Sequence, residues 1–334
     1  MTAPQSSFLR ILGMGKYLPQ HCVSSAELEG QLGLPAGWAE QRSGVRLRYH
    51  SRGESGALLG ARALEAALDA AGLVFADLDL LVCGAATFDY IIPNQASVIK
   101  REVVGGRDSH IPAFNVDSTC LSFVTALDLA AQLLDGRRYR RIGLVSAEVA
   151  SQGLDPGNAE TATLFGDGAA AAVVGWEPEG ESRVIKAAQH TWSEGVFDTQ
   201  IKGGGNAYHF REHPYDPALH SFAMQGKNLL RLASKKVPFF MEEFFADLPL
   251  SLAEVDLVVP HQASKFGLEM VQRLLHLRDE QYFTHLATHG NCIASSIPMA
   301  LHDAIQQGRL QRGQTCLLCG TSAGFSVGAV LLRY

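Results

Sequence analysis

The stretches Leu78-Asp-Leu-Leu-Val-Cys83 and Val255-Asp-Leu-Val-Val259 are two versions of one short apolar segment, one in each half of the chain. A short apolar run of this kind is typical of a strand buried in a sheet. Helical and strand-like segments alternate around both stretches, for example an Ala- and Leu-rich helix expected over 58–73 and a strand expected over 111–116. This alternation predicts a layered α/β fold.

The second half repeats the order of the first beyond this strand. The segment from Phe283 to Asn291, which precedes an expected helix, corresponds to the segment from Phe114 to Cys120. The apolar run at 315–319 corresponds to the run at 142–145. The first and third matches begin 64 residues apart in one half, at 78 and 142, and 60 residues apart in the other, at 255 and 315.

The repeat predicts two similar halves. A polar stretch, Glu177–Arg183, separates them, so we expect one half over residues 1–176 and the other over residues 177–334. The first half would carry a nucleophilic cysteine and the second a histidine and an asparagine. A duplicated fold of this kind places its site where the halves meet.

The composition of the 334-residue chain is ordinary, with 47% hydrophobic and 19% charged residues and a net charge of −6. Such values are typical of a globular protein, and no Lys/Arg block is long enough to bind nucleic acid. No apolar run approaches the roughly 18 residues of a membrane span. The polar N-terminus leads into Phe8 without the layout of a signal peptide. We therefore expect a cytoplasmic protein.

The six cysteines are expected to be thiols, because disulfides are rare in the cytoplasm. Cys316-Leu-Leu-Cys319 has C-x-x-C spacing but lies inside an apolar run that indicates a buried strand. No second Cys or His pair stands at ligand spacing, so the sequence predicts neither a redox motif nor a metal site.

The clearest candidate nucleophile is Cys120, in Asp117-Ser-Thr-Cys120-Leu-Ser-Phe123. An expected strand ends there, a turn of small residues follows, and a helix begins at or just after the cysteine. Free N–H groups and the dipole at a helix N-terminus favour an anion, so we expect the thiol pKa to fall toward ~3.5–7.5. The alternative is a small buried side chain that only packs.

Two side chains in the second half follow expected strand or turn positions. His261 comes directly after Leu257-Val-Val-Pro260, at the carboxyl end of a strand, where α/β sheets bind ligands. Asn291 follows Thr288-His-Gly290 on a turn before a helix. Taken singly, the first could be structural and the second a helix cap. Together with Cys120, these side chains could form a thioester on the cysteine and stabilise negative charge on the oxygen of a second thioester.

Gly320-Thr-Ser322-Ala-Gly324 matches the G-x-S-x-G pattern of α/β-hydrolases. In those enzymes the histidine of the triad follows the serine, whereas the last histidine here is His302. We interpret the segment as a glycine-flanked loop that exposes backbone N–H groups, a natural oxyanion hole.

These residues resemble the β-ketoacyl-acyl-carrier-protein synthase III family of the thiolase superfamily. The resemblance runs from Gly13 to Tyr334. Its most specific part is the ordered set of Cys120, Pro260-His261-Gln-Ala263 and His289-Gly-Asn291. Further matching segments are Trp38–Arg46, Phe114–Phe123, Leu164–Gly168 and Gly320–Gly328.

The resemblance implies a thiolase fold with duplicated halves in a five-layer αβαβα arrangement, and a homodimer. Cys120 would take an acyl group from acyl-CoA, with the backbone N–H groups of Cys120 and Ala323 holding the oxyanion. A malonyl thioester, malonyl-ACP or malonyl-CoA, would then lose carbon dioxide while His261 and Asn291 bind its oxygen. The resulting carbanion would attack the acyl group and release a β-ketoacyl product for fatty-acid or specialised-metabolite biosynthesis. No cofactor and no metal are implied.

The resemblance also implies residues that bind coenzyme A, with Trp38 and Arg42 stacking on and pairing with its nucleotide. The family's housekeeping members carry an arginine where this chain has Ala159, and another on the surface that docks the acyl carrier protein, where it has Phe266. Lys227 would partly compensate for the missing positive charge.

Ile92 matches the family residue that closes the acyl pocket of the partner subunit. It is commonly a phenylalanine in members that start from acetyl groups, so the smaller isoleucine predicts a longer pocket. Two other activities remain open at this stage: non-decarboxylative head-to-head condensation, and transfer of the acyl group to a hydroxyl or amine. A non-catalytic subunit is a third reading, against which the intact set of Cys120, His261 and Asn291 argues.

Overall fold

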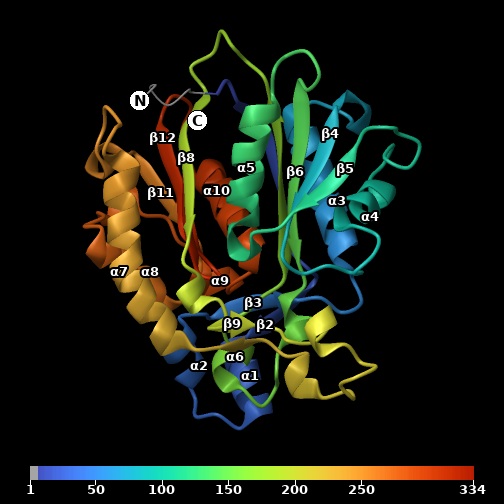
Figure 1. The fold of residues 1–334 in the computed structure, drawn as a ribbon, viewed down its shortest axis with the longest axis vertical. Coiled ribbons are helices and arrows are strands. Elements are labelled where there is room, and N and C mark those ends of the chain that lie inside the picture. The colour runs from blue at the N-terminus through green and yellow to red at the C-terminus, as the bar shows by residue number, and fades with distance from the viewer. Residues whose placement is uncertain (1–6) are drawn as a thin grey trace.

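The computed structural model describes residues 7–334, which form two main sheets covered by helices (Figure 1). The first sheet has the strand order β1 (Arg10–Tyr17), β7 (Gly168–Gly175), β6 (Arg141–Glu148), β4 (Leu80–Gly84) and β5 (Ala113–Val116). The second has the order β11 (Leu257–Pro260), β12 (Thr315–Ser322), β13 (Ser326–Arg333) and β8 (Arg183–Thr191).

Helices and sheets stack in five layers (Figure 1). From one side to the other the helix layers are α7 (Gly226–Phe245) with α8 (Lys265–Leu274), then α5 (Ser122–Leu133) with α10 (Ser296–Gln306), then α3 (Gly56–Ala71) with α4 (Gln95–Glu102). One sheet lies between each pair of helix layers. The αβαβα thiolase arrangement expected from the sequence is therefore confirmed.

The two sheets share one pattern of strand pairing. β4 lies parallel to both β6 and β5, while β6 pairs antiparallel with β7, and β7 with β1. In the second sheet β11 lies parallel to β12, β12 pairs antiparallel with β13, and β13 with β8. A parallel bridge from Val258 to Tyr282 stands where β5 stands in the first sheet. The repeat seen in the sequence is thus a repeat of topology.

Close packing in the first half depends on small residues. All eight residues of β7 are buried, and most of them are alanine or glycine. A Cβ atom added to Gly13 or Gly15 of β1 would lie 2.4 Å from the carbonyl oxygen of Ala67 or 2.2 Å from that of Ala63, both in α3. The backbone of β1 therefore touches the backbone of α3 at positions that only glycine allows.

The expected elements lie close to the observed ones. The helix expected over 58–73 is α3, which ends at Gly72 in a left-handed cap (φ 67°). The strand expected over 78–83 is β4. The helix expected after Cys120 begins at Ser122, because a 3₁₀ turn, Thr119–Leu121, comes first.

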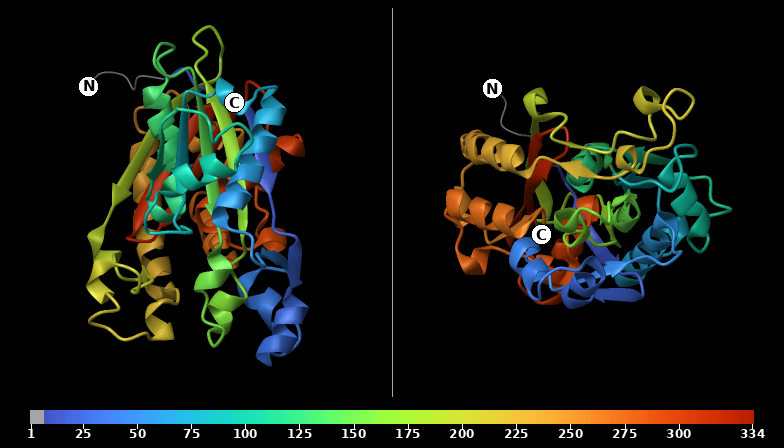
Figure 2. Two further views of the ribbon diagram at one scale, coloured as in Figure 1. Left: turned by 90° about the vertical axis from the view of Figure 1, so that its right-hand side faces the viewer. Right: turned by 90° about the horizontal axis from the view of Figure 1, so that it is seen from below.

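Short elements gather at one end of the two sheets (Figures 1 and 2). They are β2 (His21–Ser24), α1 (Ser25–Leu32), α2 (Trp38–Ser43), β3 (Leu47–His50), α6 (Ala159–Ala162), β9 (Thr199–Gln200), β10 (Ala223–Met224) and α9 (Leu286–His289). All six cysteines are free thiols. Within residues 7–334, none of the helices has both the length and the apolar character needed to cross a membrane.

Candidate active site

Cys120 lies on the 3₁₀ turn that joins β5 to α5. The turn is sharp, because the residue before the cysteine, Thr119, has a positive φ of 52°. The carboxylate of Asp117 accepts a hydrogen bond from the backbone N–H of Thr119 at 2.8 Å and fixes this conformation. The side chain of Cys120 thereby lines a cavity of about 660 Å³, which we call the catalytic cavity.

His261 lines the same cavity from the end of β11. Its backbone N–H donates to the carbonyl of Cys319 at 2.8 Å, which continues the pairing of β11 with β12 past Pro260. The neighbouring strand has a glycine here for a physical reason. A Cβ atom on Gly320 would lie 2.6 Å from the Cβ atom of His261.

Asn291 is held by a segment of the first half. Its backbone N–H donates to the carbonyl of Leu164 at 2.9 Å, and its carbonyl accepts from the N–H of Gly166 at 3.1 Å. Gly290, with φ 72°, brings the turn so close that a Cβ atom would lie 2.7 Å from the Leu164 carbonyl oxygen. The side-chain Nδ2 donates to the carbonyl of Ala263 at 3.1 Å. Asn291 is thereby tied to the segment that carries His261.

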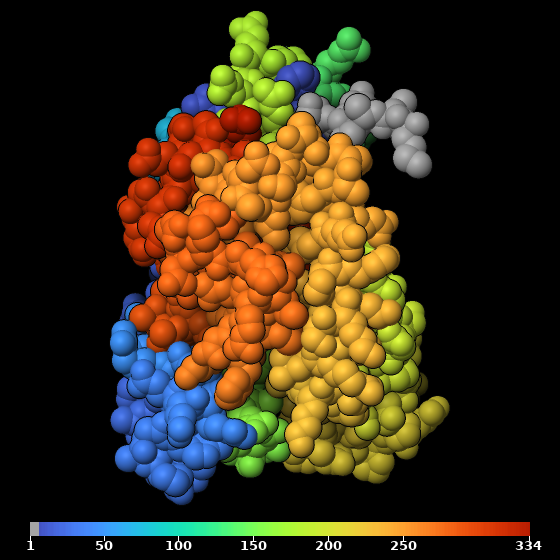
Figure 3. All heavy atoms as spheres, turned by 90° about the vertical axis from the view of Figure 1, so that its left-hand side faces the viewer, coloured from blue at the N-terminus to red at the C-terminus, as the bar shows by residue number. Residues whose placement is uncertain are grey.

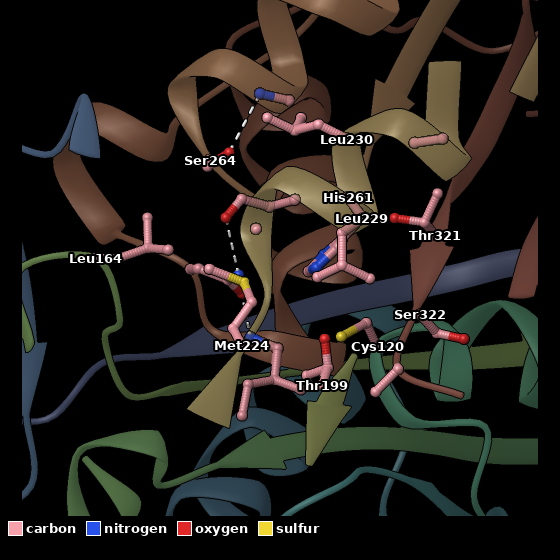
Figure 4. Close-up of a pocket in the computed structure, with 18 of the residues that line it drawn as sticks. Cys120, Leu164, Thr199, Met224, Leu229, Leu230, His261, Ser264, Thr321 and Ser322 are labelled. Carbon is pink, nitrogen blue, oxygen red and sulfur yellow. Dashed lines mark hydrogen bonds between the residues drawn. The ribbon is translucent and has the colours of Figure 1, made fainter. Parts of the chain in front are cut away.

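The structure brings together Cys120, His261, Asn291 and Ala323, all of which line the catalytic cavity. In Figure 4 Cys120 and His261 point into one space, with Ser322 of β12 beside the sulfur. The side chains come from both halves of the chain, as the sequence predicted for the site.

Burial sets the charge state of the Cys120 thiol. Loss of solvent raises its pKa to about 12, and the backbone N–H of Ala323, which acts in the opposite direction, does not overcome this effect. The expectation of a lowered thiol pKa is therefore wrong for the free protein. Desolvation of the sulfur outweighs the nearby backbone N–H groups, which lower the pKa.

Burial also keeps His261 neutral. Desolvation lowers the pKa of its imidazole to about 4. Among the described residues Nδ1 finds no hydrogen-bond partner, so no carboxylate opposes this effect. A neutral imidazole offers one N–H donor and one acceptor nitrogen, and it does so throughout the neutral pH range.

A buried ionic cluster lies beneath the turn of Asn291, and no local pattern along the chain indicates it. The Lys16 Nζ atom lies 2.5 Å from Asp303 Oδ1 and 3.2 Å from His289 Nε2. The Nδ1 atom of His285 lies 2.8 Å from Asp303 Oδ2, and the rings of His285 and His289 stack with centroids 4.1 Å apart. Two histidines and an aspartate suit a metal, but here the ammonium group of Lys16 already supplies the positive charge.

This cluster has strongly shifted pKa values. Burial, together with the neighbouring His285 and Lys16, lowers the pKa of His289 to about 3. Burial alone would raise the pKa of Asp303, but hydrogen bonds from His285, His302 and Lys16 hold it far below its ordinary value. The charged carboxylate of Asp303 and the neutral ring of His285 thus anchor the ring of His289, which stands two residues before Asn291.

Of the three residues expected to bind coenzyme A, Arg42 and Lys227 line the catalytic cavity and Trp38 does not. Trp38 begins α2, one helical turn before Arg42. The guanidinium of Arg42 forms an exposed ion pair with Glu160 at 3.1 Å. Glu160 directly follows Ala159, so this chain has an acidic residue beside the position where an arginine was expected to matter.

Ile92 does not line the catalytic cavity of its own chain. Its side chain is 86% exposed, and Tyr90 and Ile91 beside it are 57% and 83% exposed. Its role in a partner subunit stays a prediction.

Comparison with known proteins identifies the family. The family model for 3-oxoacyl-[acyl-carrier-protein (ACP)] synthase III matches residues 114–193, and the model for its C terminal matches residues 245–334. A beta-ketoacyl-[acyl-carrier-protein] synthase III of Coxiella burnetii is 30% identical over 329 residues, which cover 98% of this chain and 99% of that protein.

Solved structures agree. The 3-oxoacyl-[acyl-carrier-protein] synthase III of Aquifex aeolicus superposes with a TM-score of 0.88 at 27% identity, covering 98% of this chain and 100% of that one. The priming β-ketosynthase of the R1128 polyketide pathway gives a TM-score of 0.87 at 25% identity, covering 100% and 98%. The chain belongs to the β-ketoacyl-acyl-carrier-protein synthase III family and is a condensing enzyme of the acyltransferase class.

Proposed function

We propose that Cys120 receives an acyl group from acyl-CoA and that His261 and Asn291 then assist decarboxylative condensation with malonyl-ACP or malonyl-CoA. The observation that carries this proposal is the meeting of one thiol, one neutral imidazole and one amide in a single cavity. The proposed reaction uses no redox cofactor, because it consists of a thioester exchange and a decarboxylative carbon–carbon bond formation, neither of which needs an oxidant or a reductant.

In the first step the Cys120 sulfur attacks the thioester carbonyl, and its proton leaves with the coenzyme as a free thiol. Negative charge on the carbonyl oxygen is held by the backbone N–H groups of Cys120 and Ala323. Ala323 suits this role because its backbone N–H hydrogen-bonds the Cys120 sulfur and lowers the pKa of the thiol. The Thr119 hydroxyl donates to the Ala323 carbonyl at 3.2 Å and keeps the two loops in register.

In the second step the malonyl carboxylate leaves as carbon dioxide, and its electron pair forms an enolate. Stabilising that enolate requires uncharged N–H donors that stay in place. His261 is neutral, and one hydrogen of the Asn291 amide is already committed to Ala263, which leaves the other for the substrate. The carbanion then attacks the acyl carbonyl, and the Cys120 sulfur departs from the β-ketoacyl product as a thiolate, which takes a proton from solvent and becomes a thiol again.

The substrates enter past Arg42 and Lys227, and we propose that both contact the coenzyme or carrier phosphate. Arg42 must exchange its ion pair with Glu160 for the phosphate, so coenzyme binding should be weaker than with a free arginine. We also propose a cytoplasmic homodimer, with the exposed apolar residues Tyr90, Ile91 and Ile92 in the interface, where Ile92 borders the partner's acyl pocket.

Intact-protein mass spectrometry tests the proposal. Acyl-CoAs of different length are offered to the wild-type protein, and malonyl-CoA is then added while carbon dioxide release is measured. We expect an acyl mass on Cys120 that disappears when malonyl-CoA arrives. Cys22→Ser is the matched control, because Cys22 is an exposed thiol outside the cavity. Acylation that survives in Cys120→Ser, or product without carbon dioxide release, contradicts the proposal.

A further inference from the structure

The buried ionic cluster consists of Lys16, His285, His289 and Asp303, and it joins distant parts of the chain. Lys16 belongs to β1 of the first sheet, and Asp303 belongs to α10 in the central helix layer. Their side chains are only 17% and 11% exposed. Figure 3 shows the outer face covered by α7 and α8, whereas the cluster lies inside, where β1 meets the central layer. Taking two charges out of water is costly, so a buried ion pair calls for a reason other than stability.

The contact between Lys16 and His289 fixes which ring nitrogen of His289 carries the hydrogen. The Lys16 Nζ atom lies 3.2 Å from Nε2 of that ring. An ammonium group has three N–H donors and no acceptor, so Nε2 must accept and carries no hydrogen. The hydrogen of the neutral ring therefore stands on Nδ1, 2.9 Å from the hydroxyl oxygen of Thr288. That hydroxyl can accept it, because it donates its own hydrogen to the carbonyl of His285 at 3.1 Å.

A ring fixed in this way holds the backbone that presents Asn291. His289 ends α9, and a single glycine separates it from Asn291. The backbone here has little room to move, since a Cβ atom added to Gly166 would lie 2.3 Å from the carbonyl oxygen of His289. One hydrogen of the Asn291 amide is already bound to the carbonyl of Ala263. A shift of the His289 ring would therefore move the hydrogen that remains for the substrate.

The same short helix is bonded to the strand end that carries His261. The side-chain oxygen of Gln262, the next residue, accepts hydrogen bonds from two successive N–H groups at the start of α9, at 3.0 and 3.1 Å. The first of these N–H groups belongs to His285, whose Nδ1 atom lies 2.8 Å from Oδ2 of Asp303. Asp303 thus lies behind the segment of His261 as well as the segment of Asn291.

The turn of Cys120 depends on a different hydrogen bond. The carboxylate of Asp117 accepts from the N–H of Thr119, and the ionic cluster takes no part in this bond. Among residues 7–334, those that line the catalytic cavity include none of the four residues of the cluster. A change in the cluster therefore acts on the chemistry through the groups that it holds, and these belong to the second half.

We propose that the Lys16–Asp303 ion pair positions the N–H donors of the condensation step, above all the amide of Asn291. This inference rests on the proposed function and adds to it two positioning residues that do not touch the substrate. Misplacing a catalytic group by about 1 Å can cost roughly 100-fold in rate. Loss of the Lys16 ammonium should therefore slow condensation and leave acylation of Cys120 nearly unchanged.

The test measures the two half-reactions separately in wild type and Lys16→Met. Transfer of an acyl group from acyl-CoA to Cys120 is followed by intact mass. Release of carbon dioxide from malonyl-CoA is then measured on protein that already carries the acyl group. Methionine is also unbranched, but it removes the charge and the three N–H donors. Acylation should stay within about twofold, whereas carbon dioxide release should fall by about 10- to 100-fold.

Lys186→Met is the matched control. Lys186 of β8 also forms an ion pair, with Asp247, and its side chain is 16% exposed, close to the 17% of Lys16. Both variants should unfold at a lower urea concentration than wild type, but carbon dioxide release should fall only in Lys16→Met. Three results overturn the proposal: an unchanged release in Lys16→Met, an equal fall of both of its half-reactions, or the same selective loss in Lys186→Met.

Nitrogen NMR gives a readout that does not depend on activity, because it distinguishes a ring nitrogen with a hydrogen from one without. In wild type, Nε2 of His289 should be the nitrogen without a hydrogen. In Lys16→Met this preference should weaken, and the side-chain amide signal of Asn291 should shift. That signal is assigned by its absence from Asn291→Asp. Lys186→Met should leave both observations as in wild type. A hydrogen on Nε2 in wild type, or an unmoved amide signal in Lys16→Met, contradicts the proposal.

Asp303→Asn keeps the proposal testable if Lys16→Met does not fold. The two side chains are similar in size, so this variant removes the charge that holds Lys16 without opening a cavity. It should show the same selective loss of carbon dioxide release, and an equal fall of both half-reactions overturns the proposal.

Failure of this inference and failure of the proposed function look different. If wild type performs both half-reactions and Lys16→Met performs them equally well, the function stands and the inference fails. If wild-type Cys120 accepts no acyl group, the function fails. The NMR comparison of wild type, Lys16→Met and Lys186→Met then decides by itself whether Lys16 positions Asn291, and identical amide signals in the three proteins overturn that role.

Discussion

The turn that carries Cys120 and the turn that carries Asn291 have the same backbone in the two halves of the molecule. Thr119 in the first and Ile293 in the second both have a positive φ, 52° and 48°, which is unusual for β-branched residues. In each case the side chain two residues earlier accepts a hydrogen bond from that residue's N–H at 2.8 Å. The acceptor is Asp117 in the first turn and Asn291 in the second.

A second hydrogen bond repeats as well. The Ser122 hydroxyl, at the start of α5, accepts from the N–H of Ser118 at 3.0 Å. The Ser296 hydroxyl, at the start of α10, accepts from the N–H of Cys292 at 2.9 Å. The two turns are therefore one scaffold used twice.

The difference lies in the side chains that the scaffold displays. Position by position, Cys120 corresponds to Ala294, and Asp117 corresponds to Asn291. The first turn thus offers a sulfur where the second has a methyl group, and the second offers an amide where the first has a carboxylate. One backbone conformation therefore presents different side chains in the two halves, and under the proposed function these differences give the two turns different roles.

The largest effect is expected from Cys120→Ala, which gives the first turn the residue that the second has at this point. The scaffold hydrogen bonds remain, so the protein should fold and yet form no acyl adduct in mass spectrometry. Ala294→Cys is the reciprocal variant. Ala294 is fully buried, so a thiol there should stay unmodified. A stable adduct on the introduced thiol would break the distinction between the turns.

Asn291→Asp should come next, because it gives the second turn the carboxylate of the first. The acceptor for the Ile293 N–H is retained, but the amide donor is lost. Release of carbon dioxide should fall by about 10²–10³-fold, as when one oxyanion donor is removed. Asp117→Asn, the reciprocal change, keeps its acceptor and should leave acylation nearly unchanged. Wild-type decarboxylation in Asn291→Asp would remove Asn291 from the proposed mechanism.

The pH dependence of stability separates the catalytic groups of the two halves. His261 has a pKa of about 4 when folded, against roughly 6.5 when unfolded, so below pH 6.5 the unfolded chain binds the proton and the folded protein does not. Stability should therefore fall with falling pH, by about 2 kcal/mol from this group between pH 7 and pH 5. His261→Gln should lose that share of the acid sensitivity in urea unfolding, whereas Cys120→Ala should keep it. Equal slopes in all three proteins would contradict the buried, neutral imidazole.

The smallest effect concerns the shared scaffold itself. Ser122→Ala and Ser296→Ala each leave a backbone N–H without its acceptor, so each should cost about 1 kcal/mol or slightly more in unfolding free energy. Denaturant titration of both variants, with wild type as reference, measures the losses. Similar losses support two equivalent turns. A loss confined to one turn would show that the same geometry contributes differently to the stability of the two halves.

The fold could be predicted from the sequence, and so could the meeting of Cys120, His261 and Asn291 in one cavity, because both follow from local patterns. The apolar runs at 78–83 and 255–259 became β4 and β11, and Cys120, His261 and Asn291 follow strands or turns that can be recognised along the chain. Within the repeat, however, the sequence comparison of the two halves aligned the wrong positions. Matching the segment ending at Asn291 with the segment ending at Cys120 is wrong by three residues, because the position of each 3₁₀ turn has no distinct local signature.

What the sequence could not reveal depends on distant contacts. The pKa of Cys120 follows from how deeply the whole fold buries the sulfur, which no local pattern encodes. The cluster beneath Asn291 joins Lys16 to Asp303, 287 residues away. Gly226, Leu230, Ala233, Val237 and Met241 of α7 line the catalytic cavity, but their helical spacing alone does not distinguish a cavity wall from a packed core.

The link between Lys16 and Asp303 also has a consequence for the order of assembly. A ribosome adds roughly 5–20 residues each second, so many seconds pass between the synthesis of Lys16 in β1 and that of its partner Asp303. The turn of Cys120 can be complete while the anchor of His289 and Asn291 is still being synthesised. Closing so long a loop is slow, because the loss of chain entropy comes first and the contacts that offset it form only once the loop is closed. Ribosome-bound chains shorter than about 300 residues should therefore carry the turn of Cys120 without the ionic anchor of His289 and Asn291.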